Sequence, residues 1–421
     1  MKALSYILIF LSLAVIPVPI SAADFQEKLT WDDCVREATI TNPDLLAAGM
    51  EVNQAAAEKR MTRANLLPQI SADAATSTSK SSGDDQGESY SYGIEGRQLI
   101  FDGLKSWYDL DQSAQELIVA HQRYEITSMG VRLSLREAFI SLLKAQELVG
   151  ISENIAARRR KQAGLVELRY QGGREHKGAL LTSRANLSQA EYDITRARRD
   201  IEVSREELRK ELGRDGPAPK RAEGELVISP RQPGPPAFDQ LVNEHPTVLE
   251  LAARKEGSQF ELDSSYSVFS PEIYGRAGIR RSDSDWPPSD ENWSVSLTVS
   301  LPLFEGGSRI DDLSRARSAL TGSEEEERSG RSGVFLDMRE SWINLEDADE
   351  YVSIQKQFQD AGEERAKIAE AQYSSGLLSF DNWIIIEDDL VRAQKRYLEA
   401  RAEAMRAEAQ WTYARGGTLE D

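Results

Sequence analysis

The sequence contains an internal repeat, whose two copies are offset by 203 residues (246 − 43 = 203). Prolines, glycines and tyrosines recur at this spacing without a gap: Pro43 and Pro246, Gly130 and Gly333, Tyr170 and Tyr373, Gly213 and Gly416. Glycine and proline mark turns and breaks in secondary structure, so their shared spacing constrains both halves in the same way. The repeat spans about 170 residues and indicates two structural equivalents in tandem.

Each copy contains an alternating stretch that ends in a corner. In the first half of WSVSLTVSLPLFEGG, which runs from Trp293 to Gly307, apolar and polar residues alternate strictly, which is typical of a β-strand with one apolar and one polar face. Pro302 ends the strand because it has no N–H to donate. The matching stretch is YSYGIEGRQLIFDG at 90–103, and a strand at 69–79 precedes it. The sequence therefore predicts β-hairpins at 67–101 and 270–304, with strands long enough to cross a membrane.

A helical pattern follows each corner and dominates the chain. From 104 to 171 nothing interrupts it, which corresponds to about 100 Å of helix. Apolar residues there step by three and four, as in a coiled-coil seam: Leu135, Ala138, Leu142, Ala145 and Val149. A glycine turn and a return helix follow in each copy. We expect two long antiparallel helical hairpins, at 104–212 and 307–415.

The ends and the middle of the chain complete the predicted organisation. Lys2, an apolar run at 3–16 and the small residues at 21–23 predict a signal peptide at 1–23. The alternative is an uncleaved anchor, but the run is shorter than the ~20 residues of a spanning helix. The segment 215–236 holds six prolines and no periodicity. The predicted units are a first repeat at 24–212, a linker at 213–236 and a second repeat at 237–421.

Charge and residue usage exclude several classes of function. The chain has 51 basic and 70 acidic residues, a net charge of −19, which argues against nucleic acid as a partner. Cys34 is the only cysteine, so no disulfide forms within the chain. The three histidines are far apart, and neither a phosphate-binding loop nor a nucleophile elbow is present. We predict no catalytic site, no cofactor and no metal site.

Four membrane strands per chain cannot close a barrel, and open sheet edges are not tolerated in lipid. Bacterial outer-membrane barrels have an even number of strands, eight or more. Two chains would supply eight strands and three chains twelve. Serine-rich faces suit a wet lumen and apolar faces suit outer membrane lipid.

At this point the residues resemble a known family, the TolC-like outer membrane efflux proteins (outer membrane factors). The resemblance rests on the doubled unit, on the corners LIFDG and PLFEGG, and on the turn YSSGLLSFD from Tyr373 to Asp381. It covers essentially the whole mature chain. It implies an α+β membrane protein whose four strands per chain join in a trimeric transmembrane β-barrel, continued through the periplasm by an α-barrel of long helical hairpins.

The same resemblance implies partners and a function. Such proteins are passive homotrimeric conduits in the outer membrane of tripartite efflux or type I secretion systems. They dock an inner-membrane transporter through a periplasmic adaptor protein. The adaptor-contact turns carry over to Gly173 in the first repeat and to Gly376, Leu377, Leu378 and Ser379 in the second. The first turn departs from the family pattern, because His176 and Gly178 replace its Ser and Asp.

Four acidic residues follow the second turn: Asp381, Glu387, Asp388 and Asp389. Three symmetry copies of one carboxylate at the end of a tube would form a ring that attracts cations. Relatives carry an aspartate ring at this level, so we expect Asp381 or Asp388 to line a periplasmic constriction. The alternative is that these acids are solvated on the outer wall.

The alternative function, from a different class, is that of a trimeric coiled-coil stalk or adhesin, which is anchored by a small barrel and transports nothing. A parallel stalk needs neither a return helix nor an internal repeat, which favours the conduit. Within the conduit class the sequence does not separate drug, metal and protein substrates. It has no Met-rich or His-rich lining that would favour metal.

Overall fold

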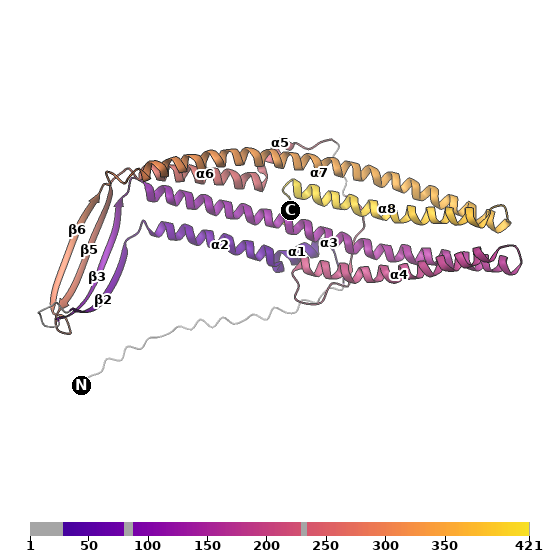
Figure 1. The fold of residues 1–421 in the computed structure, drawn as a ribbon, viewed down its shortest axis with the longest axis horizontal. Coiled ribbons are helices and arrows are strands. Elements are labelled where there is room, and N and C mark those ends of the chain that lie inside the picture. The colour runs from indigo at the N-terminus through magenta and orange to yellow at the C-terminus, as the bar shows by residue number, and fades with distance from the viewer. Residues whose placement is uncertain (1–27, 80–86, 229–233, 421) are drawn as a thin grey trace, which may run out of the picture.

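The protein is elongated, with a β-sheet at one end and long helices over the rest of its length (Figure 1). The computed structural model describes residues 28–79, 87–228 and 234–420, so the predicted signal peptide at 1–23 lies outside the described residues. The helices are α1 (Trp31–Thr41), α2 (Pro43–Ala64), α3 (Lys105–Gln171), α4 (Lys177–Leu212), α5 (Phe238–Glu244), α6 (Pro246–Ser267), α7 (Ser308–Ser375) and α8 (Phe380–Ala414). The strands are β1 (Lys28–Leu29), β2 (Gln69–Ser79), β3 (Gly87–Phe101), β4 (Arg221–Ala222), β5 (Glu272–Asp283) and β6 (Asp290–Ser300).

The two longest helices confirm the predicted helical hairpins. Helix α3 has 67 residues and α7 has 68, so each is about 100 Å long. Each returns through its partner, α4 or α8, and both turns lie at the end of the molecule away from the sheet (Figure 1). The heptad positions are the buried ones: Leu135, Leu142, Met338 and Leu345 are each at most 1% exposed.

The four long strands form one antiparallel sheet in the order β2-β3-β5-β6. The register of the sheet places apolar and small residues of β3, β5 and β6 opposite one another, on the same face. Val295 lies opposite Ala277, which lies opposite Gly96, and the same ladder joins Trp293, Ile279 and Ile94. The intervening residues are mostly polar or charged, and they include the ion pair of Arg280 with Asp73 at 2.7 Å. The sheet therefore has an apolar face and a polar face, as expected, and β2 and β6 are its two edges.

Left-handed backbone makes the corner between sheet and helix. Gly306 and Gly307 have φ of +66° and +95° at the second corner, while Gly103 and Leu104 have +71° and +73° at the first. A Cβ on Gly103 would lie 2.8 Å from the carbonyl oxygen of Ser267, so this glycine also permits a close approach. Leucine at φ +73° is strained, at a cost of about 1–2 kcal/mol.

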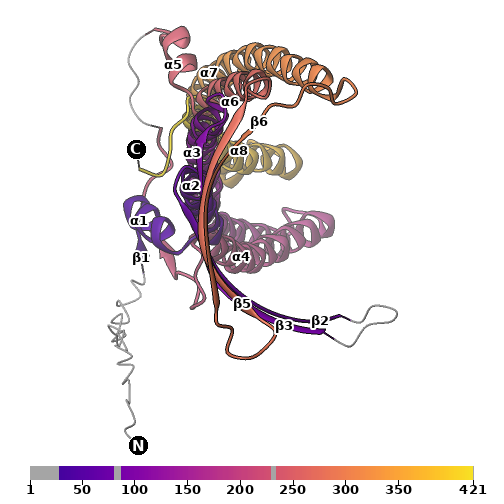
Figure 2. The ribbon, with the colours of Figure 1, turned by 90° about the vertical axis from the view of Figure 1, so that its left-hand side faces the viewer.

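A group of short elements, here called the belt, lies beside the middle of the long helices. It consists of β1, α1, β4 and α5, and β1 pairs in parallel with β4. Figure 2 shows α1, α5 and the C-terminus on one side of the long helices, away from the side toward which the sheet curves. The strand pair lies partly in the expected linker, where the sequence analysis did not predict it.

Equivalent caps begin the second helix of each repeat. The side-chain oxygen of Asn42 accepts the N–H groups of Asp44 and Leu45 at 3.0 and 3.1 Å. In the second repeat Nδ1 of His245 accepts the N–H of Thr247 at 3.2 Å. His245 is only 5% exposed. Burial lowers the pKa of its imidazole from 6.5 to about 4, and the nearby charge of Asp337 only partly offsets this.

We expect this histidine to make the protein less stable in mild acid. Its folded pKa lies below the unfolded value, so its stabilisation is complete above pH 6.5 and is lost as the pH falls to about 4. The loss is on the order of 3 kcal/mol of unfolding free energy. His245→Asn keeps a capping residue and cannot titrate. The melting temperature of this variant should fall less than that of the wild type between pH 7 and 4; parallel curves would contradict the assignment.

Candidate functional site at the helical tip

The helical tip comprises the α3–α4 turn at 172–176 and the α7–α8 turn at 376–379. The two turns lie side by side at the end of the molecule farthest from the sheet (Figure 1). The turns hold every predicted adaptor-contact residue, and the two constriction candidates, Asp381 and Asp388, lie in the first turns of α8 beside them. The geometry of the tip is built from two helix ends, two helix starts and an aromatic core between them.

The α7–α8 turn presents an apolar residue to solvent. Gly376 ends α7 at φ +82°, and its N–H donates to the carbonyl of Tyr373 at 3.0 Å. The N–H of Leu377 reaches back to the carbonyl of Gln372 at 2.8 Å, which closes the helix end in the manner of a Schellman motif. The side chain of Leu377 is 81% exposed. Leu378 instead packs on the core of the tip.

The two helices after the turns begin with equivalent caps. Ser379 accepts the N–H of Asn382 at 3.4 Å and starts α8. In the other turn Nδ1 of His176 accepts the N–H of Ala179 at 3.1 Å and starts α4. The histidine at the position of the family serine therefore performs the same capping function.

The α3–α4 turn has the same shape but a different surface. Gly173 has φ +64°, and the N–H of Arg174 donates to the carbonyl of Arg169 at 2.8 Å. Arg174 stands where the other turn carries Leu377 (174 + 203 = 377). The exposed residue at this position is thus cationic in one turn and apolar in the other.

An aromatic core connects the two turns. The rings of Tyr373 and Trp383 stack with centroids 4.2 Å apart, and both residues are at most 1% exposed. The guanidinium of Arg169 lies 4.6 Å above the Tyr373 ring and donates to the Tyr373 carbonyl oxygen at 2.7 Å. The Tyr373 hydroxyl donates to Glu175 at 2.9 Å. Burial and this hydrogen bond raise the pKa of Tyr373 well above its ordinary value of 10.

Ion pairs bind three of the four predicted acids. Glu387 is 2% exposed and accepts two hydrogen bonds, at 2.9 and 2.8 Å, from the guanidinium of Arg158. The next arginine along α3, Arg159, binds Asp388. These bonds join the first helical hairpin to the second, and removal of one partner of the buried pair would leave an uncompensated charge. Asp389 pairs with Arg392 on its own helix.

Asp381 differs from the other acids. It lies in the first turn of α8, its side chain is exposed, and no ion pair involves it within the described part of the chain. The structure thus separates the two candidate residues for the constriction. Asp388 binds an arginine of the same chain, whereas Asp381 is open to solvent.

The residues that join the two hairpins are not among those predicted from the sequence. Arg158, Arg159, Arg169 and Glu175 carry the contacts between the two halves of the tip. Two adjacent arginines about four turns before a helix end, opposite an acidic cluster, are a weak signal. A comparison of the basic residues of the first repeat with the acidic residues of the second, at similar distances from the turns, could have indicated these ion pairs.

The histidines and carboxylates do not form a metal site in the described residues. Residues 28–79, 87–228 and 234–420 contain no group of three or more metal-ligand side chains. His176 and His245 act as helix caps, as described above. In these same ranges, none of the helices has a long enough apolar stretch to span a lipid bilayer.

Comparison with known proteins gives a family match on both repeats. The family model described as "Outer membrane efflux protein" matches residues 34–214 and 237–417. The two matched segments are offset by 203 residues (237 − 34 = 203), which is the offset of the internal repeat. Together they cover most of the chain.

Individual relatives are distant but align over nearly the whole length. The probable outer membrane lipoprotein SilC of Salmonella typhimurium is 20% identical over 375 residues, which are 87% of this chain and 81% of SilC. The outer membrane protein TolC of Escherichia coli strain K12 is 23% identical over 399 residues, 87% of this chain and 78% of TolC. A crystal structure of CusC shares the fold with a TM-score of 0.85 and 18% identity, over 92% of each chain.

Proposed function

The chain belongs to the outer membrane efflux protein family, and from this premise we propose how its parts serve the channel. The protein is the outer membrane channel of a tripartite efflux system, with an extension into the periplasm. It is a component of a transport system and not an enzyme. The family match on both repeats favours this function over a stalk or adhesin.

Channels of this family act as homotrimers. For this chain we propose that the edge strand β6 of one protomer pairs with β2 of the next. One chain leaves both edges of its sheet open, and lipid does not tolerate unpaired backbone groups. Three chains then supply twelve strands. The long helices that continue the sheet would form the periplasmic tube, with a periplasmic adaptor and an inner-membrane transporter at the helical tip.

The mass of the detergent-purified protein tests this closure. We expect the mass of three chains after the detergent contribution is subtracted. The β-content should disappear together with the trimer on denaturation, because each sheet is completed by its neighbours. A monomer that keeps its full β-content would contradict the proposal.

We further propose that Asp381 forms the acidic ring at the periplasmic entrance. The observation that supports it is the contrast between the solvent-exposed carboxylate of Asp381 and the arginine-bound carboxylate of Asp388. Three free carboxylates near the axis of a trimer create a negative potential that favours cations. Asp388 would instead keep the two hairpins together.

Single-channel conductance in planar bilayers distinguishes the two aspartates. The Asp381→Ala variant should lose most of its cation selectivity and its block by trivalent cations. The Asp388→Ala variant should keep both and unfold more easily at the tip. Asp32→Asn removes a carboxylate from the belt and should leave conductance unchanged. If Asp381→Ala behaves like Asp32→Asn, the acid faces the outer wall.

A further inference from the structure

One cavity lies in the belt, far from the helical tip. It has a volume of about 730 Å³, within the usual range for small-molecule sites. Its walls come from α1, α3, α5, α7 and α8 and from the chain just before α5. Helices α1 and α5, which form part of its wall, lie on the side away from the curve of the sheet (Figure 2), and we therefore place the cavity on the outer side of the proposed tube.

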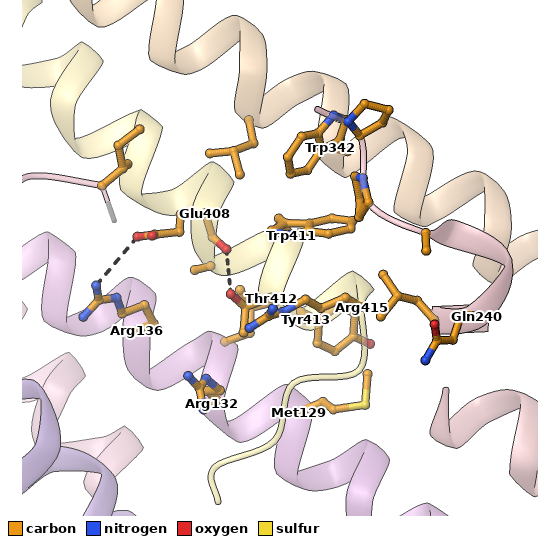
Figure 3. Close-up of a pocket in the computed structure, with 18 of the residues that line it drawn as sticks. Met129, Arg132, Arg136, Gln240, Trp342, Glu408, Trp411, Thr412, Tyr413 and Arg415 are labelled. Carbon is orange, nitrogen blue, oxygen red and sulfur yellow. Dashed lines mark hydrogen bonds and ion pairs between the residues drawn. The ribbon is translucent and has the colours of Figure 1, made fainter. Parts of the chain in front are cut away.

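Tryptophan rings form the apolar part of the cavity. Trp31, Trp342 and Trp411 all line it, although the whole chain has only seven tryptophans. The rings of Trp342 and Trp411 meet edge to face with centroids 5.2 Å apart (Figure 3). Tryptophan faces bind the C–H side of a sugar ring as well as flat aromatic groups.

Arginines give the cavity a charge opposite to that of the protein. Arg132, Arg136 and Arg415 line it, against the single carboxylate of Glu408, while the whole chain has a net charge of −19. Arg136 lies 4.6 Å above the ring of Trp31. Its guanidinium is also 4.0 Å from the carboxylate of Glu408 (Figure 3). Burial lowers the pKa of Arg136, and the charge of Glu408 offsets part of this effect while that of Arg132 adds to it.

Uncharged polar groups complete the lining. Gln240, Thr412 and Tyr413 offer amide and hydroxyl groups beside the tryptophans. A fatty acid would require a continuous apolar wall, which this cavity does not have. A ligand that combines a ring with an apolar face, several hydroxyl or amide groups and one carboxylate fits all three parts of the lining. Arginine binds carboxylates with paired hydrogen bonds.

We propose that this cavity binds a carboxylated amino sugar of the kind found in the bacterial cell wall. With the cavity on the outer side of the tube, such binding would attach the channel to the wall that it crosses. The cell-wall glycan alternates a neutral amino sugar with one that carries a lactyl carboxylate. The arginines would select the acidic unit and the tryptophans would stack on its ring.

Binding to the purified full-length channel tests the proposal, with N-acetylmuramic acid as the probe. N-acetylglucosamine has the same ring without the carboxylate and serves as the matched ligand. Saturation-transfer NMR should show saturable binding of the acid and binding about tenfold weaker or more for the neutral sugar, the effect of losing one charge-assisted contact. Indole-3-acetate tests for a general preference for aromatic acids.

Two variants locate the site. Arg415→Gln changes an exposed arginine at the C-terminal end of α8, and Trp342→Leu removes one ring. Each should weaken binding of the acid about tenfold and leave trimer mass and conductance unchanged. Arg328→Gln, on the exposed surface of α7 outside the cavity, should have no effect.

Three results would each overturn the proposal. One is equal binding of the acidic and neutral sugars, or binding of neither at millimolar concentration. Another is binding of indole-3-acetate without the sugar acid, which would assign the cavity to a different ligand class. The third is wild-type affinity in both cavity variants. Conductance is measured on the same preparations, so failure of this proposal is distinct from failure of the channel function.

Discussion

Export should fall to the level of a strain without the channel when Leu377 is replaced by aspartate. The side chain is 81% exposed at the end of the helical tip, where an adaptor would meet the tube. Loss of an apolar anchor at the centre of an interface costs about 2–4 kcal/mol, and each trimer carries three copies. A buried carboxylate without a partner adds a further penalty.

The turn itself should survive the change. The hydrogen bond from Leu377 to Gln372 uses backbone atoms, and Gly376 keeps its left-handed conformation. The Leu377→Asp trimer should therefore assemble normally and conduct ions. Gly376→Asp adds backbone strain at φ +82° and should reduce export as well. Drug-resistance or secretion assays, in cells that have no other channel, measure the effect.

Two matched variants make this test specific. Gln357→Asp adds the same charge on the exposed surface of α7, about 30 Å from the turn, and should leave export intact. Arg174→Asp changes the equivalent position in the other turn and shows whether both turns contact the adaptor. Wild-type export by Leu377→Asp would remove the α7–α8 turn from the docking surface.

Arginine at Val295 should prevent the protein from reaching the outer membrane as a trimer. Val295 lies near the middle of β6 on the apolar face of the sheet, opposite Ala277. An arginine facing lipid at the bilayer midplane costs about 2–4 kcal/mol. Three copies per trimer bring the penalty to about 6–12 kcal/mol, comparable with the stability of a domain.

The neighbouring position provides the control. Ser294 lies on the opposite face of β6, paired with Gly278, which in turn pairs with Glu95. Ser294→Arg should assemble normally, because its charge would lie in the wet lumen beside a carboxylate. Membrane fractionation and native gels measure both variants. If Ser294→Arg fails and Val295→Arg assembles, the two faces of the sheet are assigned the wrong way round.

The long helices and strands were predictable because each has one apolar face, and its apolar residues therefore recur at a regular spacing in the sequence. The alternation in Trp293 to Leu301 and the three-four spacing after Leu135 both persist over many residues. The short belt elements carry no such signal. A two-residue strand such as β1 has no period, and its partner lies almost 200 residues away. The left-handed backbone at Leu104 could not be predicted from its residue type, whereas glycine at the equivalent position, Gly307, indicates such a conformation.

The composition of the tip was predictable, but its connections were not. The glycine that ends α7 follows from local rules for helix ends, and the structure has it at Gly376 in the left-handed conformation. The pairing of Arg158 with Glu387 depends on how one helical hairpin is rotated against the other. No local pattern encodes that rotation, so the sequence identified the acids without their partners.

The parallel pair of β1 with β4 has a consequence for the order of folding. Each helical hairpin is built from neighbours in sequence and can form as soon as its turn has emerged. Leu29 lies beside Ala222, so the first strand has no partner until the whole first repeat and part of the linker are present. Contacts between distant residues form slowly, because a long loop must close before they contribute. The β1–β4 pair is therefore expected to close only after the first helical hairpin has folded.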